Sequence, residues 1–287
     1  MGMAERICFL GRGGVGKSVI VSNISASLAK MGYGVLQIGN DISLNSTMLL
    51  RDDENITPVL EEFRNKYHIQ VEDYLVKGSS GVYCLELGSI EPGVGCLARG
   101  INLVDEMMEQ QGMLEKYHIN YVLYDIVGDI PCTGYILPIR EGIMSQCIII
   151  TDGNYSALCT TNSILAGVVR IDKENQKLVR LLINQADKYP TKSLITSYAE
   201  ATNLTILGYL NHYMQIEIST LSEKTVIEDC PDCIAAKEFE KLSHSVIHIC
   251  KPKCPKPFDR DELLKWQKKW KLDQLEQKSG IIQPGNI

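Results

Sequence analysis

The segment Gly11–Ser18, GRGGVGKS, most constrains the fold of this chain, because it matches the phosphate-binding pattern G-x-x-x-x-G-K-[ST] at every fixed position. A short apolar stretch, Arg6–Leu10, precedes it, and Ser18–Met31 carries apolar residues at helical spacing. A strand, the loop and a helix therefore follow in the order that a phosphate loop requires. The pattern predicts a nucleoside triphosphate as ligand, with Lys17 on the β- and γ-phosphates and Ser18 on Mg²⁺.

The loop supplies most of the residues that we expect to contact the nucleotide. Its glycines let backbone N–H groups turn toward phosphate oxygens, and the start of the following helix adds a partial positive charge. A glycine-rich turn without a ligand is the alternative interpretation. The expected nucleotide contacts in this loop are Gly13, Gly14, Val15, Gly16, Lys17, Ser18 and Val19.

The composition describes an ordinary globular protein with an acidic balance. The 287 residues are 45% hydrophobic and 22% charged, with a formal net charge of −6 and a pI near 5.5. This charge disfavours a general nucleic-acid or anionic-membrane binder, and no stretch reaches the roughly 18 continuous apolar residues of a membrane span. Because the phosphate loop begins too close to Met1 to leave room for a cleaved signal, we expect a cytoplasmic protein with small molecules or proteins as partners.

Apolar strand patterns alternate with helical patterns such as 103–111 and 157–169. This alternation is typical of an α/β protein with a doubly wound, mostly parallel sheet of the phosphate-loop NTPase type and helices on both faces. No linker interrupts the pattern, so we expect one domain over residues 1–250. The strand patterns are 35–39, 82–86, 121–125, 147–150, 178–184 and 204–209.

The segment Lys251–Pro257, KPKCPKP, ends the globular pattern. It is followed by a charged helical pattern over 259–277, in which Trp266 and Trp270 are available for docking. We therefore expect residues 251–287 to form a C-terminal tail that packs on the body or on a second subunit.

Acidic residues follow two of the predicted strands at the edge where ligands of open α/β sheets bind. Asp125 is expected to hold Mg²⁺ or its water, Gly128 to sense the γ-phosphate, and Asp129 to position the attacking water. Asp41 is a further acid at this edge. Taken alone, each aspartate also fits an N-cap or turn role.

The ten cysteines do not suggest a disulfide framework, because the cytosol keeps thiols reduced. Cys96 lies in a glycine-rich loop whose amides suit the sulfur of an iron–sulfur ligand, and Cys132 follows Asp125 closely. Two cysteines per chain do not complete a four-thiolate site, but a symmetric homodimer supplies four. On spacing alone, buried or unrelated thiols remain the default. Burial as small apolar residues is the interpretation for Cys8, Cys84, Cys147 and Cys159.

Several of these motifs occur together in one known family. Over about residues 5–250, the chain resembles the iron protein of nitrogenase and its relatives in reductive tetrapyrrole biosynthesis. The strings Glu-Pro-Gly-Val-Gly-Cys and Tyr-Asp-x-x-Gly-Asp-x-x-Cys are the most specific part of the match. The matching segments are Gly11–Ser18, Gly39–Asp41, Glu91–Gly100, Tyr124–Cys132 and Pro138–Glu141.

The resemblance implies a homodimer with one [4Fe–4S] cluster that Cys96 and Cys132 of both subunits hold. MgATP would drive the transfer of low-potential electrons to a separate nitrogenase-like catalytic protein, which docks near Cys96 and Arg99. A low-potential ferredoxin or flavodoxin would donate the electrons. Asn184 matches the family's adenine-contacting asparagine. The segment from Asp41 and the segment from Asp125 to Cys132 would be the two nucleotide-sensing switches.

The chain differs from the family mainly at residues that are expected to contact the nucleotide. Arg12 stands where the family has a lysine that reaches the nucleotide of the partner subunit, and Val19 replaces a hydroxyl residue. Asn45 and Tyr213 replace acids. These differences leave open how efficiently ATP is hydrolysed, and they favour a divergent relative that serves a partner other than true dinitrogenase. The catalytic residues implied by the resemblance are Arg12, Lys17, Asp41 and Asp129.

Four late cysteines have the spacing of a metal site, C-x₂-C followed by C-x₃-C, with His244 and His248 nearby. The helical pattern of 235–249 would separate the two pairs by roughly 20 Å. An accessory metal, a dithiol or disulfide pair, and inert thiols are all open interpretations. The four residues are Cys230, Cys233, Cys250 and Cys254.

Two other function classes share part of this pattern. A deviant phosphate-loop ATPase of the partitioning or septum-positioning type has the same fold and acts as a spatial switch. A metal-cluster assembly scaffold would depend on the late cysteine pairs. Cys96 and Cys132 distinguish the reductase hypothesis from both, whereas the electron acceptor and the final substrate are not encoded in these motifs.

Overall fold

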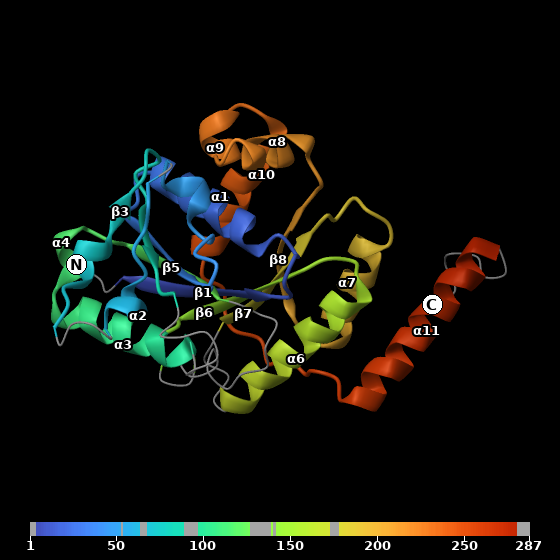
Figure 1. The fold of residues 1–287 in the computed structure, drawn as a ribbon. Coiled ribbons are helices and arrows are strands. Elements are labelled where there is room, and N and C mark those ends of the chain that lie inside the picture. The colour runs from blue at the N-terminus through green and yellow to red at the C-terminus, as the bar shows by residue number, and fades with distance from the viewer. Residues whose placement is uncertain are drawn as a thin grey trace.

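In the part of the chain that the structure describes, an eight-stranded β-sheet lies at the centre, with helices on both of its faces (Figure 1). The strand order is β3-β4-β2-β5-β1-β6-β7-β8. Their bounds are β1 Glu5–Gly11, β2 Val35–Asn40, β3 Val76–Lys77, β4 Tyr83–Glu86, β5 Tyr121–Ile126, β6 Gln146–Thr151, β7 Leu178–Asn184 and β8 Thr205–Leu210. The computed structural model describes residues 4–52, 54–63, 68–88, 97–126, 139, 142–172 and 178–279.

The pairing confirms the predicted doubly wound, mostly parallel α/β sheet. Strand β1 pairs in parallel with β5 on one side and β6 on the other, and β2 pairs in parallel with β4 and β5. The antiparallel pairing of β3 with β4 was not predicted, because a two-residue strand carries no periodic pattern. The predicted strands and most predicted helices agree with the observed elements to within a few residues at their ends, whereas the helix Leu97–Gln110 begins six residues before the predicted helix 103–111.

The helices cover the sheet in two layers. Helices α1, α9 and α10 pack on one face, and α3, α6 and α7 pack on the other. Within the described ranges, no helix is both long and apolar enough to cross a lipid bilayer. The bounds are α1 Lys17–Lys30, α2 Val59–Glu62, α3 Leu97–Gln110, α4 Met113–Lys116, α6 Tyr155–Ile171, α7 Thr191–Ala201, α8 Met214–Leu221, α9 Val226–Asp229, α10 Ile234–Ile247 and α11 Arg260–Ser279, with 3₁₀ turns η1 Met48–Leu50 and η2 Val71–Tyr74.

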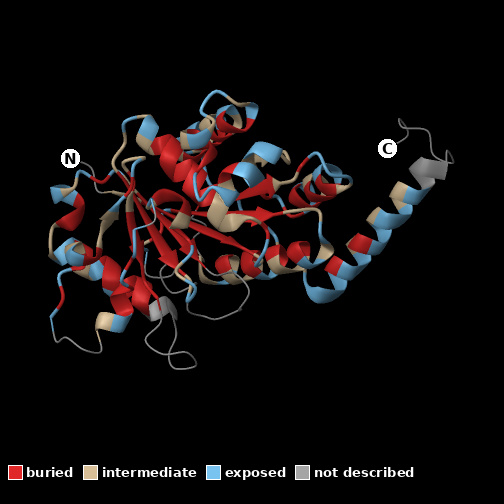
Figure 2. Ribbon diagram, turned by 45° about the horizontal axis from the view of Figure 1, so that its top comes forward, coloured by how far each residue is buried: buried red, intermediate tan, exposed pale blue. Residues whose placement is uncertain are grey.

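The core consists of two apolar layers, one on each face of the sheet (Figure 2). In β1, Ile7 and Phe9 point to the layer of α1 and α10, whereas Cys8 and Leu10 point to the layer of α3 and α6. Successive side chains of a strand alternate between its faces, so an unbroken apolar run suits a strand that is covered on both sides. This packing fixes the carboxyl ends of β1, β2, β4 and β5 at one edge of the sheet.

The last helix packs on α6 and α7 through a cluster of aromatic rings. The rings of Phe258 and Trp266 meet the ring of Tyr198 edge-on, with centroids 6.0 and 5.9 Å away. The buried side chain of Asn162 donates to the carbonyl oxygen of Phe258 at 2.9 Å and accepts from its N–H at 3.0 Å. The hydroxyl of Tyr198 donates to the same amide oxygen at 3.0 Å. One amide on α6 therefore fastens the segment that leads into α11.

We predict that Asn162→Ala loosens this segment without unfolding the body of the protein. The change removes three hydrogen bonds around Phe258, each worth about 1 kcal/mol, so limited proteolysis within 251–259 should become at least about tenfold faster. Ser163→Ala is the matched control, because Ser163 is exposed and bonds within α6. Equal cleavage rates in the two variants would contradict the role of Asn162.

Candidate functional site

The phosphate loop leaves the carboxyl end of β1 and ends where α1 begins. Gly16 precedes α1 with a φ of 87°, a left-handed conformation that favours glycine. Gly11 passes close to β6, and a Cβ there would lie 2.5 Å from the carbonyl oxygen of Ile150. The first N–H groups of a helix have few partners within the helix, so the start of α1 beside this loop is an arrangement that favours an anionic ligand.

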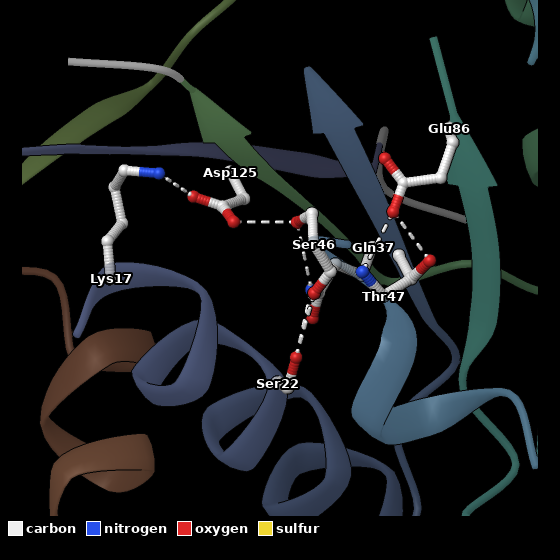
Figure 3. A network of polar contacts seen from close by, with 7 residues as sticks. All are labelled: Lys17, Ser22, Gln37, Ser46, Thr47, Glu86 and Asp125. Carbon is white, nitrogen blue, oxygen red and sulfur yellow. Dashed lines mark hydrogen bonds and ion pairs between the residues drawn. The ribbon is translucent and has the colours of Figure 1, made fainter. Parts of the chain in front are cut away.

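The carboxylate of Asp125 joins the phosphate loop to the segment that follows β2 (Figure 3). Asp125 lies near the end of β5 and is 2% exposed. Its Oδ1 accepts a hydrogen bond from Nζ of Lys17 in an ion pair, and its Oδ2 accepts one from the hydroxyl of Ser46 at 2.6 Å. Because a buried charge needs a compensating partner, Lys17 stabilises the ionised Asp125 in this structure.

Ser46 is held in turn by a polar layer between α1 and β2. Its carbonyl oxygen accepts hydrogen bonds from Nε2 of Gln37 at 2.8 Å and from the hydroxyl of Ser22 at 3.1 Å. Ser25 donates to Oε1 of Gln37 at 2.7 Å, and Gln37 is fully buried. Sequence reasoning missed this layer, although a glutamine inside the apolar strand pattern of β2 and the serines of α1 were the available signal.

The same segment is tied to β4 by Glu86. The carboxylate Oε1 of Glu86 accepts from the backbone N–H of Thr47 at 2.8 Å and from its hydroxyl at 2.7 Å. The side chain is completely buried, and its Oε2 has no hydrogen-bond partner among the residues that the structure describes. A Cβ on Gly39 would lie 1.9 Å from that oxygen, so only glycine leaves room for this carboxyl between β2 and β4.

Burial raises the pKa of Glu86 from its ordinary value of 4.5 to about 7. The two hydrogen bonds from Thr47 and the charge of Arg51 act in the opposite direction, and the carboxylate of Asp125 adds to the rise. Desolvation dominates because the charged form has lost its water. Glu86 is therefore a buried carboxyl that changes charge near neutral pH.

A cavity of about 430 Å³ opens beside the phosphate loop, a size that suits a small organic ligand. Asn184 lines it at the end of β7 and also holds the loop, since its Nδ2 donates to the carbonyl oxygen of Val15 at 2.9 Å. Its Oδ1 accepts from the N–H of Gln185 at 2.9 Å. Val19, Tyr213 and Phe239 line the same cavity. The predicted nucleotide residues Val19 and Asn184 thus meet beside the loop.

The other predicted catalytic and nucleotide residues that the structure describes belong to the phosphate loop, to α1 and to the segment after β2. Asp41 follows β2, and its Oδ1 accepts from the N–H of Ser43 at 3.1 Å, which is the turn role that the sequence left open. Arg12 is half-buried, and its carbonyl oxygen accepts from the N–H of Val15 at 3.3 Å. Ser18 is half-buried in the first turn of α1, and Gly13 and Gly14 are exposed.

The predicted cluster ligands Cys96 and Cys132, and the predicted switch residues Gly128 and Asp129, lie outside the described residues. The described elements next to them are placed at the same edge of the sheet. In the sequence, Cys96 follows β4 and Cys132 follows β5, and helix α3 begins directly after Cys96 with Arg99 in its first turn. The roles of these residues stay predictions.

The late cysteines do not gather into one cluster in the described part of the chain. Cys230 and Cys233 lie at the start of α10, whereas Cys250 and Cys254 follow its end. Among the described residues, no group of three or more histidine, cysteine or acidic side chains has the geometry of a metal site.

Solved structures with the same fold define the class to which this architecture belongs. The MinD cell division protein of Aquifex aeolicus superposes with a TM-score of 0.66 at 17% identity, covering 87% of this chain and 100% of that one. A ParA family ATPase from Chlorobium tepidum gives a TM-score of 0.64 at 15% identity, covering 84% and 98%. The fold is therefore that of the phosphate-loop NTPases.

Sequence comparison narrows the class to one family. Residues 5–273 match the model of the 4Fe-4S iron sulfur cluster binding proteins, NifH/frxC family, and the chain belongs to this family. Nitrogenase iron protein 2 of Paenibacillus durus is 32% identical over 287 residues, covering 99% of this chain and 98% of that protein. Nitrogenase iron protein 2 of Methanothermococcus thermolithotrophicus is 30% identical, covering 93% and 96%. The resemblance seen in the motifs is thus confirmed, at an identity that marks a divergent member.

We predict that Lys17→Met destabilises the protein by about 3 kcal/mol even without nucleotide, because Asp125 is left buried without a cation. The free energy of unfolding in urea measures this loss. Asp125→Asn in the Lys17→Met background should recover most of it. Lys30→Met is the control on the same helix, because the Lys30–Glu240 pair is exposed and should cost less than about 1 kcal/mol. A double variant as unstable as Lys17→Met would contradict the pairing.

We predict that Glu86→Gln changes how stability depends on pH. The raised pKa means that the folded form binds this proton more tightly than the unfolded form, whose carboxyl titrates near 4.5. The stabilisation is complete below the unfolded pKa and is lost as the pH rises through about 7. Glutamine does not ionise, so the variant should gain up to about 3 kcal/mol relative to wild type between about pH 5 and about pH 8. A difference between the two proteins that stays constant across this range would contradict the prediction.

Proposed function

We propose that this protein is an ATP-dependent electron-transfer protein, the reductase component of a nitrogenase-like system. Members of its family bind a [4Fe–4S] cluster and nucleotides, are homodimeric and work with a catalytic partner. In this proposal residues 1–250 form the ATPase and iron–sulfur domain, and 251–287 form its tail. Cys96 and Cys132 of both subunits hold one cluster, which supplies a low-potential electron when bound.

The observation that carries the proposal is the placing of β4 and β5 around β2. These two strands flank β2, and in the sequence they precede Cys96 and Cys132. Both are tied to the segment after β2, through Glu86 on β4 and Asp125 on β5. The strands that precede the proposed cluster ligands in the sequence thus end at the same edge of the sheet as the nucleotide residues, which supports a protein that couples ATP to electron transfer.

In this proposal, each residue of the site has its own role toward the nucleotide. Bound MgATP supplies the phosphoryl group, and Lys17 exchanges the Asp125 carboxylate for the β- and γ-phosphates. Asp125 is then available to Mg²⁺ or its water, and Ser18 supplies a hydroxyl ligand. Asp129 positions the attacking water, and Gly128 senses the γ-phosphate. Arg12 and Asp41 complete the catalytic set at the subunit interface and in the first switch.

The proposed partners follow from the family and not from a described surface. A nitrogenase-like catalytic protein docks near Cys96 and Arg99, and a low-potential ferredoxin or flavodoxin supplies electrons. Divergence at about 30% identity, together with Arg12, Val19, Asn45 and Tyr213, supports an acceptor other than true dinitrogenase.

A spatial or assembly switch of the partitioning type is the second candidate function. The likeness to MinD and ParA favours it, although at 15–17% identity this likeness shows the fold and nothing more. Such a switch has no need for Cys96 and Cys132. A metal-cluster scaffold is the third candidate, and it would depend on the late cysteine pairs.

Iron binding tests the proposal. Protein purified without oxygen and reconstituted should hold about four iron atoms per dimer, with an electron paramagnetic resonance signal when reduced. Cys132→Ala and Cys96→Ala should each abolish this iron, because either change removes two of four ligands. Cys159→Ala, a half-buried cysteine on α6, is the matched control and should keep it.

Two results would contradict the proposal. Wild-type protein that stays colourless and free of iron after reconstitution would favour the spatial switch. Iron that survives Cys132→Ala and is lost in Cys230→Ala would favour the scaffold.

A further inference from the structure

Cys230 and Cys233 lie in the turn that joins α9 to α10. The N–H of Cys233 donates to the carbonyl oxygen of Cys230 at 3.0 Å, which closes a four-residue β-turn. Such a turn holds its first and last Cα atoms within about 7 Å of each other. Disulfides join Cα atoms about 4.4–6.8 Å apart. The backbone therefore already brings these two cysteines to bonding range.

The two thiols are also reachable from solvent. The Cys233 side chain is close enough to that of Cys230 to raise the pKa of the Cys230 thiol. Both residues are half-buried. The pair Cys8 and Cys147 differs, because these two thiols lie 3.2 Å apart but are fully buried within the sheet. A thiol reagent in solution therefore reaches the pair at α10 and not the pair in the core.

The surroundings give the two sulfurs different roles. Cys233 is the N-cap of α10, a helix of 14 residues, and its Sγ accepts a hydrogen bond from the N–H of Ala236 at 3.4 Å. The positive end of the helix favours negative charge on this sulfur. The pKa of the Cys230 thiol is raised, chiefly by its interaction with the Cys233 side chain, with desolvation and the Asp229 carboxylate adding to the effect. Cys233 is thus suited to attack first, and Cys230 to follow.

We propose that Cys230 and Cys233 form a reversible dithiol–disulfide pair that exchanges with low-molecular-weight disulfides. In the first step the Cys233 thiolate attacks one sulfur of the disulfide, the S–S bond breaks, and one thiolate leaves. Cys230 then loses its proton to solvent and attacks the Cys233 sulfur, and the second thiolate leaves. The two cysteines lose two electrons and two protons, which the small disulfide gains as two thiols.

Oxidised glutathione is the probe for this proposal. The full-length protein, prepared without oxygen, is exposed to it, remaining thiols are alkylated, and peptides are mapped by mass spectrometry. We expect a disulfide between Cys230 and Cys233 that dithiothreitol reverses completely. The Cys250→Ser/Cys254→Ser variant is the control and should form the same disulfide at an unchanged rate.

Single variants test the order of attack. Cys230→Ser should accumulate a mixed disulfide with glutathione on Cys233, because the second thiol is missing. Cys233→Ser should form a mixed disulfide on Cys230 about tenfold more slowly. Circular dichroism of each variant shows whether the fold is retained, and wild-type mapping keeps the test valid if a variant misfolds.

Two outcomes would overturn the proposal. One is a wild-type protein in which the exposed Cys254 reacts with glutathione while Cys230 and Cys233 stay reduced. The other is equal reaction rates in the two single variants. The readout needs neither nucleotide nor iron, and mapping separates Cys96 and Cys132 from this pair, so its failure is distinct from failure of the proposed function.

Discussion

The rest of the site depends on the contacts of one buried carboxylate, that of Asp125. Its two oxygens have different partners, Lys17 from the phosphate loop and Ser46 from the segment after β2. A buried carboxylate without a cation costs several kcal/mol, so any ligand that draws Lys17 away must bring a replacement charge. In the proposed function, MgATP is the ligand that does both. The charge balance at one aspartate therefore links the phosphate loop to the segment after β2.

Besides Asp125, a layer of buried polar groups holds the segment after β2 in place. Gln37 on β2 donates a hydrogen bond to the carbonyl oxygen of Ser46, and Glu86 on β4 accepts one from the N–H of Thr47. Each of these groups is buried and would be costly to leave unpaired, so the segment has few alternative positions while they remain intact. The segment is thus tied to β2, β4 and β5, and in the sequence the proposed cluster ligands follow two of these strands, β4 and β5.

The sequence predicted the parts of this structure that local pattern determines. The strand before Gly11–Ser18, the helix after it and the alternation of strands and helices follow from hydrophobic period and glycine spacing. The sequence did not predict the long-range contacts. Nothing in the residues next to Glu86 or Gln37 shows that either side chain contacts the segment after β2. Strand β3 has only two residues, so it shows no hydrophobic period from which it could be predicted. Asp125 was found because its position at a strand end is itself a local signal, whereas its partner Ser46 was not.

Hydrogen exchange over residues 41–50, with and without MgATP, tests the central claim most directly. If nucleotide binding moves Lys17 away from Asp125, the amides of this segment should change their exchange rates in wild-type protein. Ser46→Ala, which lacks the hydroxyl that contacts Asp125, should still bind MgATP but show a much smaller change. An identical response in wild type and Ser46→Ala, or no response in wild type with nucleotide bound, would contradict the claim that Asp125 couples the two segments.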